Sequence, residues 1–301
     1  MKTNFYDEIR SNKIKSYFLV SFFIVLIAVI GGVFGLYYGS FGFGFLMAAI
    51  IGVIYTIIIF ASGDKMILSM THARPVTKKE YPYLFHTIEG LALAAGVPVP
   101  KAYVIDDSAL NAFATGKDPK HASITVTTGL LNKLSRQELE GVLAHEMSHI
   151  KNYDIRMMLL TAVLVGIVVL LSDFLLRSFL WGGARRDRDS GGGNAQLIFI
   201  VIGLVLALLA PFIAQLIKLA ISRKREYLAD ASGAMLTRYP EGLASALEKI
   251  KGDPDPLVDH ANKATAHLFI STPFRKTKGL VTNLFSTHPP IDDRIKKLRA
   301  M

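Results

Sequence analysis

The N-terminal part of the chain is an uninterrupted apolar stretch. Between Ser16 and Gly63 the sequence has no charged residue, and this stretch is more than twice the roughly 20 residues that one helical span of a bilayer needs. It divides at Tyr38-Gly39-Ser40, where glycine and serine favour a turn. We therefore expect two membrane helices, at about 17–38 and 41–61. A cleaved signal peptide is the alternative, but its apolar region is only about 7–15 residues long.

Two further apolar blocks follow in the middle of the chain. They run from Met157 to Trp181, interrupted by Asp173 and Arg177, and from Gln196 to Ile217. The segment between them is rich in glycine and charged residues, which is typical of an exposed loop. This pattern predicts a second helical hairpin and four membrane helices in all. The charges inside the first block leave another interpretation open, in which both blocks are buried helices of a soluble core.

The number of spans determines which segments share a side of the membrane. Each hairpin returns the chain to the side on which it began, so residues 62–156 and 218–301 lie together with the N-terminus. These segments carry most of the lysine and arginine residues, and basic segments remain in the cytosol. The loop between the later spans conflicts with this rule, because it contains Arg185, Arg186 and Arg188. We expect a multi-pass protein of the cytoplasmic (inner) membrane, divided into 1–61 (first hairpin), 62–156 (first cytosolic part), 157–217 (second hairpin) and 218–301 (second cytosolic part).

The cytosolic parts predict a mixed domain of helices with a small β-sheet. Ala102–Asp106 and Ala122–Thr128 are short stretches rich in β-branched residues and bounded by Gly, Pro and Asp, as strands are. Residues Lys78–Ala95 predict a helix that ends at Gly96, ahead of two prolines.

Composition and charge agree with a membrane protein. Charged residues make up 19% of the chain, against about a quarter in soluble domains. The net charge of +10 indicates either nucleic-acid binding or basic segments beside a membrane. The sequence contains no recognisable nucleic-acid-binding module, so we expect no nucleic-acid partner. The absence of cysteine excludes disulfides and thiolate metal ligands.

A pair of histidines on a predicted helix carries the candidate chemistry. Ser135-Arg136-Gln137-Glu138 has the form of a capping box, which begins a helix at Arg136. This helix continues into His145-Glu146-Met147-Ser148-His149, where side chains four residues apart share one face and can bind one zinc ion. Glu146 can then act as base on the water that such an ion activates. Because a solvated helix face can carry two histidines by chance, the motif needs a third ligand.

Glu226 and Asp230 supply the missing parts. They lie four residues apart on another predicted helix, on the membrane side that the histidine motif occupies. A carboxylate from Glu226 as third ligand leaves one position open, as catalytic zinc sites do. Asp230 is placed to accept the other ring N–H of a zinc-bound histidine. Ordinary ion pairs with the preceding basic residues 223–225 are the alternative interpretation.

The other six of the eight histidines carry little signal. Only His288 has distinctive surroundings, because Pro289 and Pro290 follow it and stiffen the backbone. A stiff loop can aim a side chain into a site, but it can equally end a helix.

Taken together, these features resemble the M48 family of membrane metallopeptidases, in particular its bacterial heat-shock protease (HtpX) branch. The resemblance extends over nearly the whole chain. The His-Glu-x-x-His motif alone occurs in many zinc peptidases, whereas the combination is specific. It rests on the hairpins and on Asn111–Ala114, Val126–Leu130, His145–His149, Arg225–Asp230, and His288–Pro290 with Arg294.

The resemblance implies a zinc-dependent endopeptidase with one Zn²⁺ per chain and an α+β, gluzincin-like catalytic domain. Its implied substrates are misfolded or membrane polypeptides, in quality control and the stress response. The resemblance places His288 near the reaction centre. It also places four residues along the substrate cleft: Asn111, Ala112, Phe113 and Ala114. A eukaryotic branch that trims prenylated proteins has more spans than this chain, which argues against that role.

Two other functions stay open at this point. A zinc-binding membrane sensor or scaffold would keep His145, His149 and Glu226 but would not need Glu146. A transporter would place ionisable groups inside the spans, of which Asp173 is the clear example.

Overall fold

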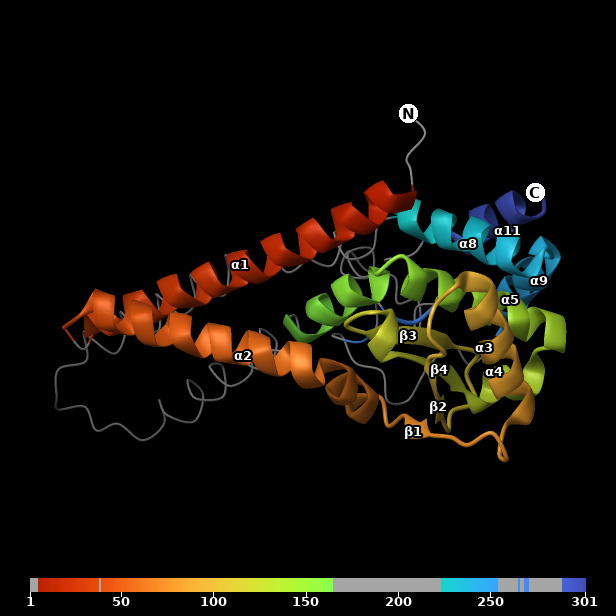
Figure 1. Cartoon of the computed structure of the whole chain (residues 1–301), viewed down its shortest axis with the longest axis horizontal. Coiled ribbons are helices and arrows are strands. Elements are labelled where there is room, and N and C mark those ends of the chain that lie inside the picture. Colours follow the sequence, from red (N-terminus) through yellow and green to blue (C-terminus); the bar gives the residue numbers. More distant parts are fainter. Residues whose placement is uncertain (1–4, 38, 165–222, 254–264, 266–267, 271–288) are drawn as a thin grey trace, which may run out of the picture.

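The computed structural model describes residues 5–37, 39–164, 223–253, 265, 268–270 and 289–301. Two long helices project from a domain that contains a small sheet and the other helices (Figure 1). The tip of this pair is its most distant part, while the start of the first helix lies against the domain.

The projecting pair consists of α1 (Phe5–Tyr37) and α2 (Phe41–Met70), an antiparallel hairpin in which Ser40 caps α2. Both helices contain segments long and apolar enough to cross a membrane. Many of their large apolar side chains are exposed, as expected of a surface that contacts lipid. The two predicted spans are confirmed as helices, and both helices extend beyond the predicted limits at the end near the domain. Exposed examples are Phe18, Val25, Phe43, Leu46, Ile51 and Ile57.

The predicted second hairpin begins as a helix over residues 154–164. Its apolar side chains are buried in one cluster with side chains of α1 and α2, so this helix packs against the base of the first hairpin. The rest of the predicted hairpin, residues 165–217, lies outside the described residues. The cluster includes Leu19, Phe23, Ile59, Ile67, Met158, Leu159 and Val163.

The sheet has four strands in the order β1-β2-β4-β3: β1 (Arg74–Pro75), β2 (Lys101–Ile105), β3 (Ala112–Gly116) and β4 (Ala122–Thr127). β2 and β4 are parallel, whereas β3 pairs with β4 in the antiparallel sense. The two predicted strands are confirmed within one residue at each end. β3 was not predicted, because its small residues carry no strand signal and the pairing with β4 imposes the extended backbone.

Helix α3 (Pro82–Ala95) begins four residues later than predicted. The Glu80 carboxylate accepts hydrogen bonds from the Thr77 N–H at 2.7 Å and from the Thr77 hydroxyl at 3.0 Å, which folds residues 77–80 into a turn. Pro82 then occupies the first turn of the helix, where its missing N–H costs nothing. The predicted end is confirmed, since Gly96 closes the helix with a left-handed φ of 70°.

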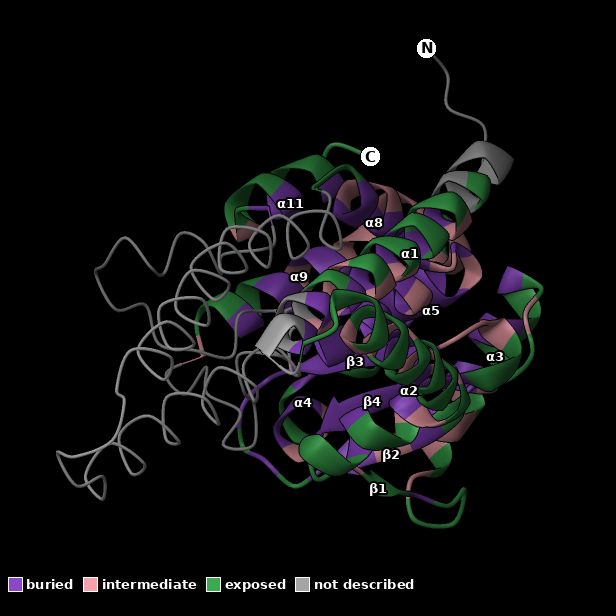
Figure 2. Cartoon of the chain, turned by 90° about the vertical axis from the view of Figure 1, so that its left-hand side faces the viewer, coloured by how far each residue is buried: buried purple, intermediate pink, exposed green. Residues whose placement is uncertain are grey.

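Helix α5 (Arg136–Lys151) is the central element of the domain. It contacts α3, the strands β3 and β4, and two later helices, α8 (Arg223–Thr237) and α9 (Pro240–Lys251). Gly141 permits the closest of these contacts, because a Cβ there would lie 2.5 Å from the Leu243 backbone nitrogen of α9. Figure 2 shows α5 and the sheet largely buried and the hairpin largely exposed. Shorter elements complete the domain: η1 (Pro119–His121), α4 (Thr128–Lys133) and α11 (Ile291–Leu298).

Candidate metal centre

Helix α5 is fixed at its start by the predicted capping box, which is confirmed. The Glu138 carboxylate accepts a hydrogen bond from the Ser135 N–H at 2.6 Å, and the Ser135 hydroxyl accepts one from the Glu138 N–H at 3.4 Å. Lys249 of α9 donates to the same carboxylate at 2.7 Å. Burial opposes ionisation of Glu138, but these donors outweigh it and lower its pKa. The rotation of α5, and with it the direction of His145 and His149, is therefore set by contacts at its first turn.

Helix α8 brings a second set of polar side chains to α5. Glu226, Asp230 and Gly233 lie on one face of α8, at helical spacing. A Cβ on Gly233 would lie 3.0 Å from the His145 backbone nitrogen, so the absence of a side chain lets α8 approach α5 closely at the first histidine. Glu226 and Asp230 are both buried.

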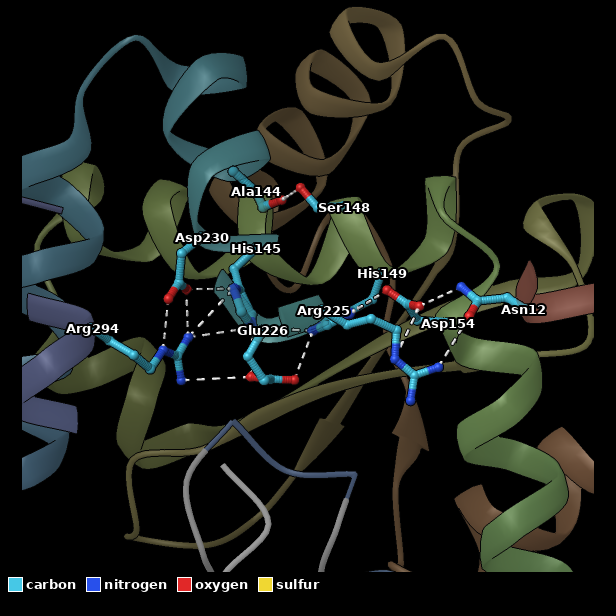
Figure 3. Close-up of polar contacts among 10 residues, drawn as sticks. All are labelled: Asn12, Ala144, His145, Ser148, His149, Asp154, Arg225, Glu226, Asp230 and Arg294. Carbon is cyan, nitrogen blue, oxygen red and sulfur yellow. Dashed lines mark hydrogen bonds and ion pairs between the residues drawn. The ribbon is translucent and has the colours of Figure 1, made fainter. Parts of the chain in front are cut away.

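Three predicted ligands converge on one point (Figure 3). The Nε2 atoms of His145 and His149 are 3.2 Å apart. A Glu226 carboxylate oxygen lies 3.7 Å from the first of these nitrogens, and the other oxygen lies 3.5 Å from the second. In a tetrahedral zinc site with bonds of about 2.0–2.1 Å, ligand atoms are about 3.3 Å apart. The distance between the two Nε2 atoms matches that spacing, while each Nε2 has a different Glu226 oxygen slightly beyond it.

Asp230 holds His145 from the side opposite the metal position. Its Oδ1 lies 2.9 Å from His145 Nδ1, so Nδ1 donates and the lone pair is on Nε2. Arg294 of α11, which is fully buried, donates to both carboxylate oxygens of Asp230 at 2.9 and 2.7 Å. Burial disfavours the charged carboxylate, but Arg294 and His145 outweigh it and lower the pKa of Asp230 to about 2. Asp230 is therefore ionised and fixed in place.

Asp154 plays the equivalent part for His149. Its Oδ2 lies 3.0 Å from His149 Nδ1. Burial disfavours a charged imidazole, but the hydrogen bond from Asp154 and the charges of Glu226 and Glu146 outweigh it, and the pKa of His149 rises to about 9. The sequence analysis missed Asp154, because a turn at Tyr153 separates it from α5 and breaks the helical spacing.

The network reaches the first membrane helix through two more buried residues that the sequence analysis did not assign. Arg225 of α8 lies 3.8 Å from Asp154 and donates to Asn12 of α1 at 3.2 Å. Asn12 in turn donates to the Asp154 carboxylate at 2.8 Å. A single asparagine ahead of an apolar run carries no sequence signal for such a role.

Charge and hydrogen-bond direction both favour a divalent cation at the point of convergence. Nδ1 of each ring faces a carboxylate, so both Nε2 atoms point toward each other and toward the Glu226 carboxylate, where a metal ion or a proton must lie between them. Apart from the imidazoles, the described buried groups of the site hold two more negative than positive charges. They are the carboxylates of Glu146, Asp154, Glu226 and Asp230 and the guanidinium groups of Arg225 and Arg294.

Glu146 lies beside the metal position. It is 2% exposed, and its negative charge contributes to the raised pKa of both His149 and Arg294. One residue corresponds to a rotation of about 100° around the helix, so Glu146 borders the site while His145 and His149 point into it. This is the position that a base acting next to a bound metal requires.

Of the four residues of the expected substrate cleft, Asn111 directly precedes strand β3 and the other three begin it. Asn111, Ala112, Phe113 and Ala114 are all at most 2% exposed, so their side chains offer no surface to an incoming molecule. Phe113 packs edge-on against Phe269, with 5.1 Å between ring centroids. Because β3 is an edge strand, a substrate could contact it only through the backbone N–H and C=O groups on its outer side. His288, the other expected site residue, lies outside the described residues.

Comparison with known proteins identifies the family of this chain. Residues 78–301 match the model of peptidase family M48. A protein named protease HtpX homolog from Dictyoglomus thermophilum is 49% identical over 297 residues, which cover 99% of this chain and 95% of that protein. A protein of the same name from Thermoanaerobacter pseudethanolicus is 47% identical over 298 residues, covering 98% of this chain and 97% of that protein.

Among solved structures, the crystal structure of S. mikatae Ste24p is similar, with a TM-score of 0.49 and 22% sequence identity. The match covers 93% of this chain and 62% of that one. The family match and the relatives of similar length lead to one identification. The buried His-His-Glu cluster and the two apolar helices able to cross a membrane are consistent with it. This chain belongs to peptidase family M48 and is a membrane-associated metalloendopeptidase.

Proposed function

We propose that this protein is a zinc-dependent endopeptidase of the cytoplasmic membrane that cleaves misfolded or membrane polypeptides. The observation that carries the proposal is the joint placement of His145, His149 and Glu226 around one point with Glu146 beside it. Two imidazoles and one carboxylate in tetrahedral spacing are the ligand set of many catalytic zinc sites. We propose one zinc ion per chain and a gluzincin-like arrangement of the catalytic helices.

Zinc in this position would polarise the scissile carbonyl and lower the pKa of an attacking water. The protein supplies the remaining chemistry. Glu146 accepts the proton of the attacking water and then delivers it to the leaving amine. Asp230 and Asp154 hold the two imidazoles in the tautomer that points a lone pair at the metal. The mechanism needs no nucleophilic side chain.

The substrate is proposed to add as a further strand to β3, in the cleft that the family resemblance places at Asn111–Ala114. The Asn111 carbonyl accepts from the Thr127 N–H of β4 and therefore faces the sheet, whereas the Ala112 carbonyl faces the outer edge, where the Ile270 N–H already donates to it. Backbone groups alternate along a strand, so Ala114 also faces the outer edge, and pairing with substrate is proposed there. Pairing through the backbone gives affinity with little sequence preference, which suits unfolded substrates.

The catalytic domain is proposed to face the cytosol, with the second hairpin crossing the membrane. The described residues of both cytosolic parts gather at one end of the α1–α2 hairpin (Figure 1), and these parts carry most of the basic residues. A cytosolic site next to the bilayer suits quality control of membrane proteins. By the same family resemblance, His288 is proposed to stand near the reaction centre.

Exchange of Glu146 separates the base from the ligands. In Glu146→Gln the side chain keeps its size but cannot accept a proton, so hydrolysis of an unfolded protein should fall by about 10²–10⁴-fold while zinc per chain stays at one. Glu226→Ala removes a ligand, so zinc and activity should be lost together. Glu140→Gln, on the same helix, should leave both unchanged. The measurements are elemental analysis and proteolysis side by side.

Wild-type cleavage by Glu146→Gln would reject the proposed mechanism. Zinc binding by a wild-type protein that cleaves no polypeptide would instead favour the sensor function.

Proline at position 114 tests the substrate strand. Its missing N–H faces the outer edge, so Ala114→Pro should leave the pairing of β3 with β4 intact. The KM for a polypeptide substrate should rise by about tenfold, which corresponds to about 1.4 kcal/mol of lost hydrogen bonding. Zinc content and the thermal unfolding midpoint serve as controls for folding. An unchanged KM in a folded, zinc-loaded variant would show that substrate does not pair with β3 at this position.

Reporter fusions test the orientation. A reporter after Met301 or next to Lys117 should give a cytosolic signal, because two spans separate these two cytosolic parts. A reporter at Gly192 should give an external signal, because only one span separates it from either part. A cytosolic signal at Gly192 would show that residues 157–217 do not cross the membrane.

A further inference from the structure

A basic cavity lies where the first membrane helix meets the domain. Its volume is about 620 Å³, and its walls come from α1, the loop after α3, the segment 118–120, and the end of α5 with the turn that follows. Asp118 is the one acid among its described lining residues, and its carboxylate already accepts hydrogen bonds from the backbone N–H groups of residues 120 and 121. Four cations line the cavity: Lys13, Lys120, Lys151 and Arg156.

Three of the four lining cations make contacts that leave their charge in place. Lys13 Nζ and the Arg156 guanidinium carbon lie 4.4 and 5.5 Å from the centre of the Tyr153 ring, and cation–π contacts hold a cation without cancelling its charge. Within the described part of the chain, Lys13, Lys120 and Arg156 have no carboxylate partner. Tyr153 itself has a left-handed φ of 61°, a conformation that costs energy for a bulky residue. Lysines on an ordinary solvated surface need no concave wall and no aromatic ring held in place as Tyr153 is. These features therefore favour a binding site.

The cavity also lies at one end of an apolar segment able to cross a membrane. Lys13 and Tyr17 belong to the first turns of the apolar segment that starts at Asn12. Tyrosine and lysine at the end of a span are typical of the head-group region. Tyr17 is exposed and still lines the cavity, so the cavity opens where lipid head groups would lie.

We propose that this cavity binds the phosphate group of an anionic phospholipid. Basic pockets beside membrane helices on the cytoplasmic side bind acidic head groups, and the converging cations here match a phosphate in charge. Free inorganic phosphate has the same charge and hydrogen-bonding groups. The cavity lies at the end of α1, however, and this position favours a lipid as the source of the bound phosphate group.

The test uses the full-length protein in bilayers that contain equal amounts of phosphatidylglycerol and phosphatidylcholine, followed by native mass spectrometry. Wild-type protein should retain phosphatidylglycerol. Lys13→Gln/Lys120→Gln should retain it about 10-fold to 30-fold less, from two lost cations near the membrane surface. Lys15→Gln/Lys101→Gln removes the same charge outside the cavity and should behave as wild type.

Three results would overturn this proposal. They are equal retention of both lipids by wild-type protein, equal loss in the two double variants, and binding of inorganic phosphate without retention of phosphatidylglycerol. Competition of millimolar phosphate with the bound anionic lipid would support it. Zinc content, measured in each variant, shows that folding is intact.

A separate observation concerns Asn12. It is 1% exposed, at the start of an apolar membrane segment, and it makes contacts with both cytosolic parts of the chain. Its amide donates to the Asp154 carboxylate at 2.8 Å and to the Asn152 carbonyl at 3.1 Å, and its oxygen accepts from Arg225 at 3.2 Å. Asp154 orients His149, and Arg225 precedes Glu226 in α8. One side chain of the membrane helix thus contacts the neighbours of two metal ligands.

We infer that Asn12 is a positioning residue, through which the first membrane helix fixes the metal ligands. This inference rests on the proposed zinc site. A buried amide that is hydrogen-bonded at both ends restricts Asp154 and Arg225 to one arrangement. Loss of the amide would leave the Asp154 carboxylate free to rotate and would loosen the ring of His149.

Zinc affinity of metal-free protein, measured by competition with a chelator, tests Asn12 without relying on activity. Asn12→Leu should weaken zinc binding by about 10-fold, the lower end of effects from outer partners of a metal site. In an Asp154→Asn background the same change should add nothing, because both act along one route. Ser16→Ala is the control, since its buried hydroxyl donates only within α1.

The outcomes separate this inference from the proposed function. A wild-type protein without zinc affinity would remove the zinc site itself. Wild-type zinc affinity in Asn12→Leu, or additive effects in the double variant, would overturn only the role of Asn12. The shorter Asn12→Ser tests the same point if the leucine variant does not fold.

Discussion

The Nε2 atoms of two nearly perpendicular imidazole rings lie 3.2 Å apart in the interior of this protein, and each ring is held at its other nitrogen by a buried carboxylate. Asp230 and Asp154 make both rings donate away from the centre, so that two lone pairs and the Glu226 carboxylate meet at one point. In water such groups would be hydrated; in a buried site they need a cation or a proton. The pKa of His149 is raised for the same reason, because the carboxylates of Asp154 and Glu226 outweigh burial and favour a positive charge on its ring.

The same electrostatic requirement explains why remote segments are drawn together. Asp230 is ionised because Arg294, 64 residues further along the chain, donates to both of its oxygens. Asp154 is held by Asn12, 142 residues earlier. Each of these groups is buried and would be costly to bury without its partner. The hydrogen bonds around the candidate metal centre therefore link the first membrane helix, α5, α8 and α11 to one another.

The candidate metal site is directly connected to the helices able to cross a membrane. The helix over residues 154–164 begins with the carboxylate that orients His149 and continues into the apolar cluster with α1 and α2. The turn before it carries Tyr153, which lies in the wall of the basic cavity. The candidate metal ligands and the helices able to cross a membrane thus meet within a few residues of one turn. In the proposed function, this arrangement would place the catalytic centre near the bilayer surface.

The sequence by itself determined everything that depends on local periodicity. The lack of charge between Ser16 and Gly63 identified the first hairpin, and the capping box with His145 and His149 four residues apart identified the metal-binding helix. The i, i+4 spacing of Glu226 and Asp230 likewise identified their common face, because hydrophobic runs and helical spacing follow from the bilayer and the backbone alone.

Only the tertiary structure decided which distant groups complete the centre. Asp154 follows a turn that breaks the spacing, Arg294 approaches from the last helix, and Asn12 comes from the membrane hairpin. β3 is extended because β4 pairs with it. These features arise from long-range hydrogen bonds and from the need to partner buried charge, which no pattern in a short stretch of sequence records.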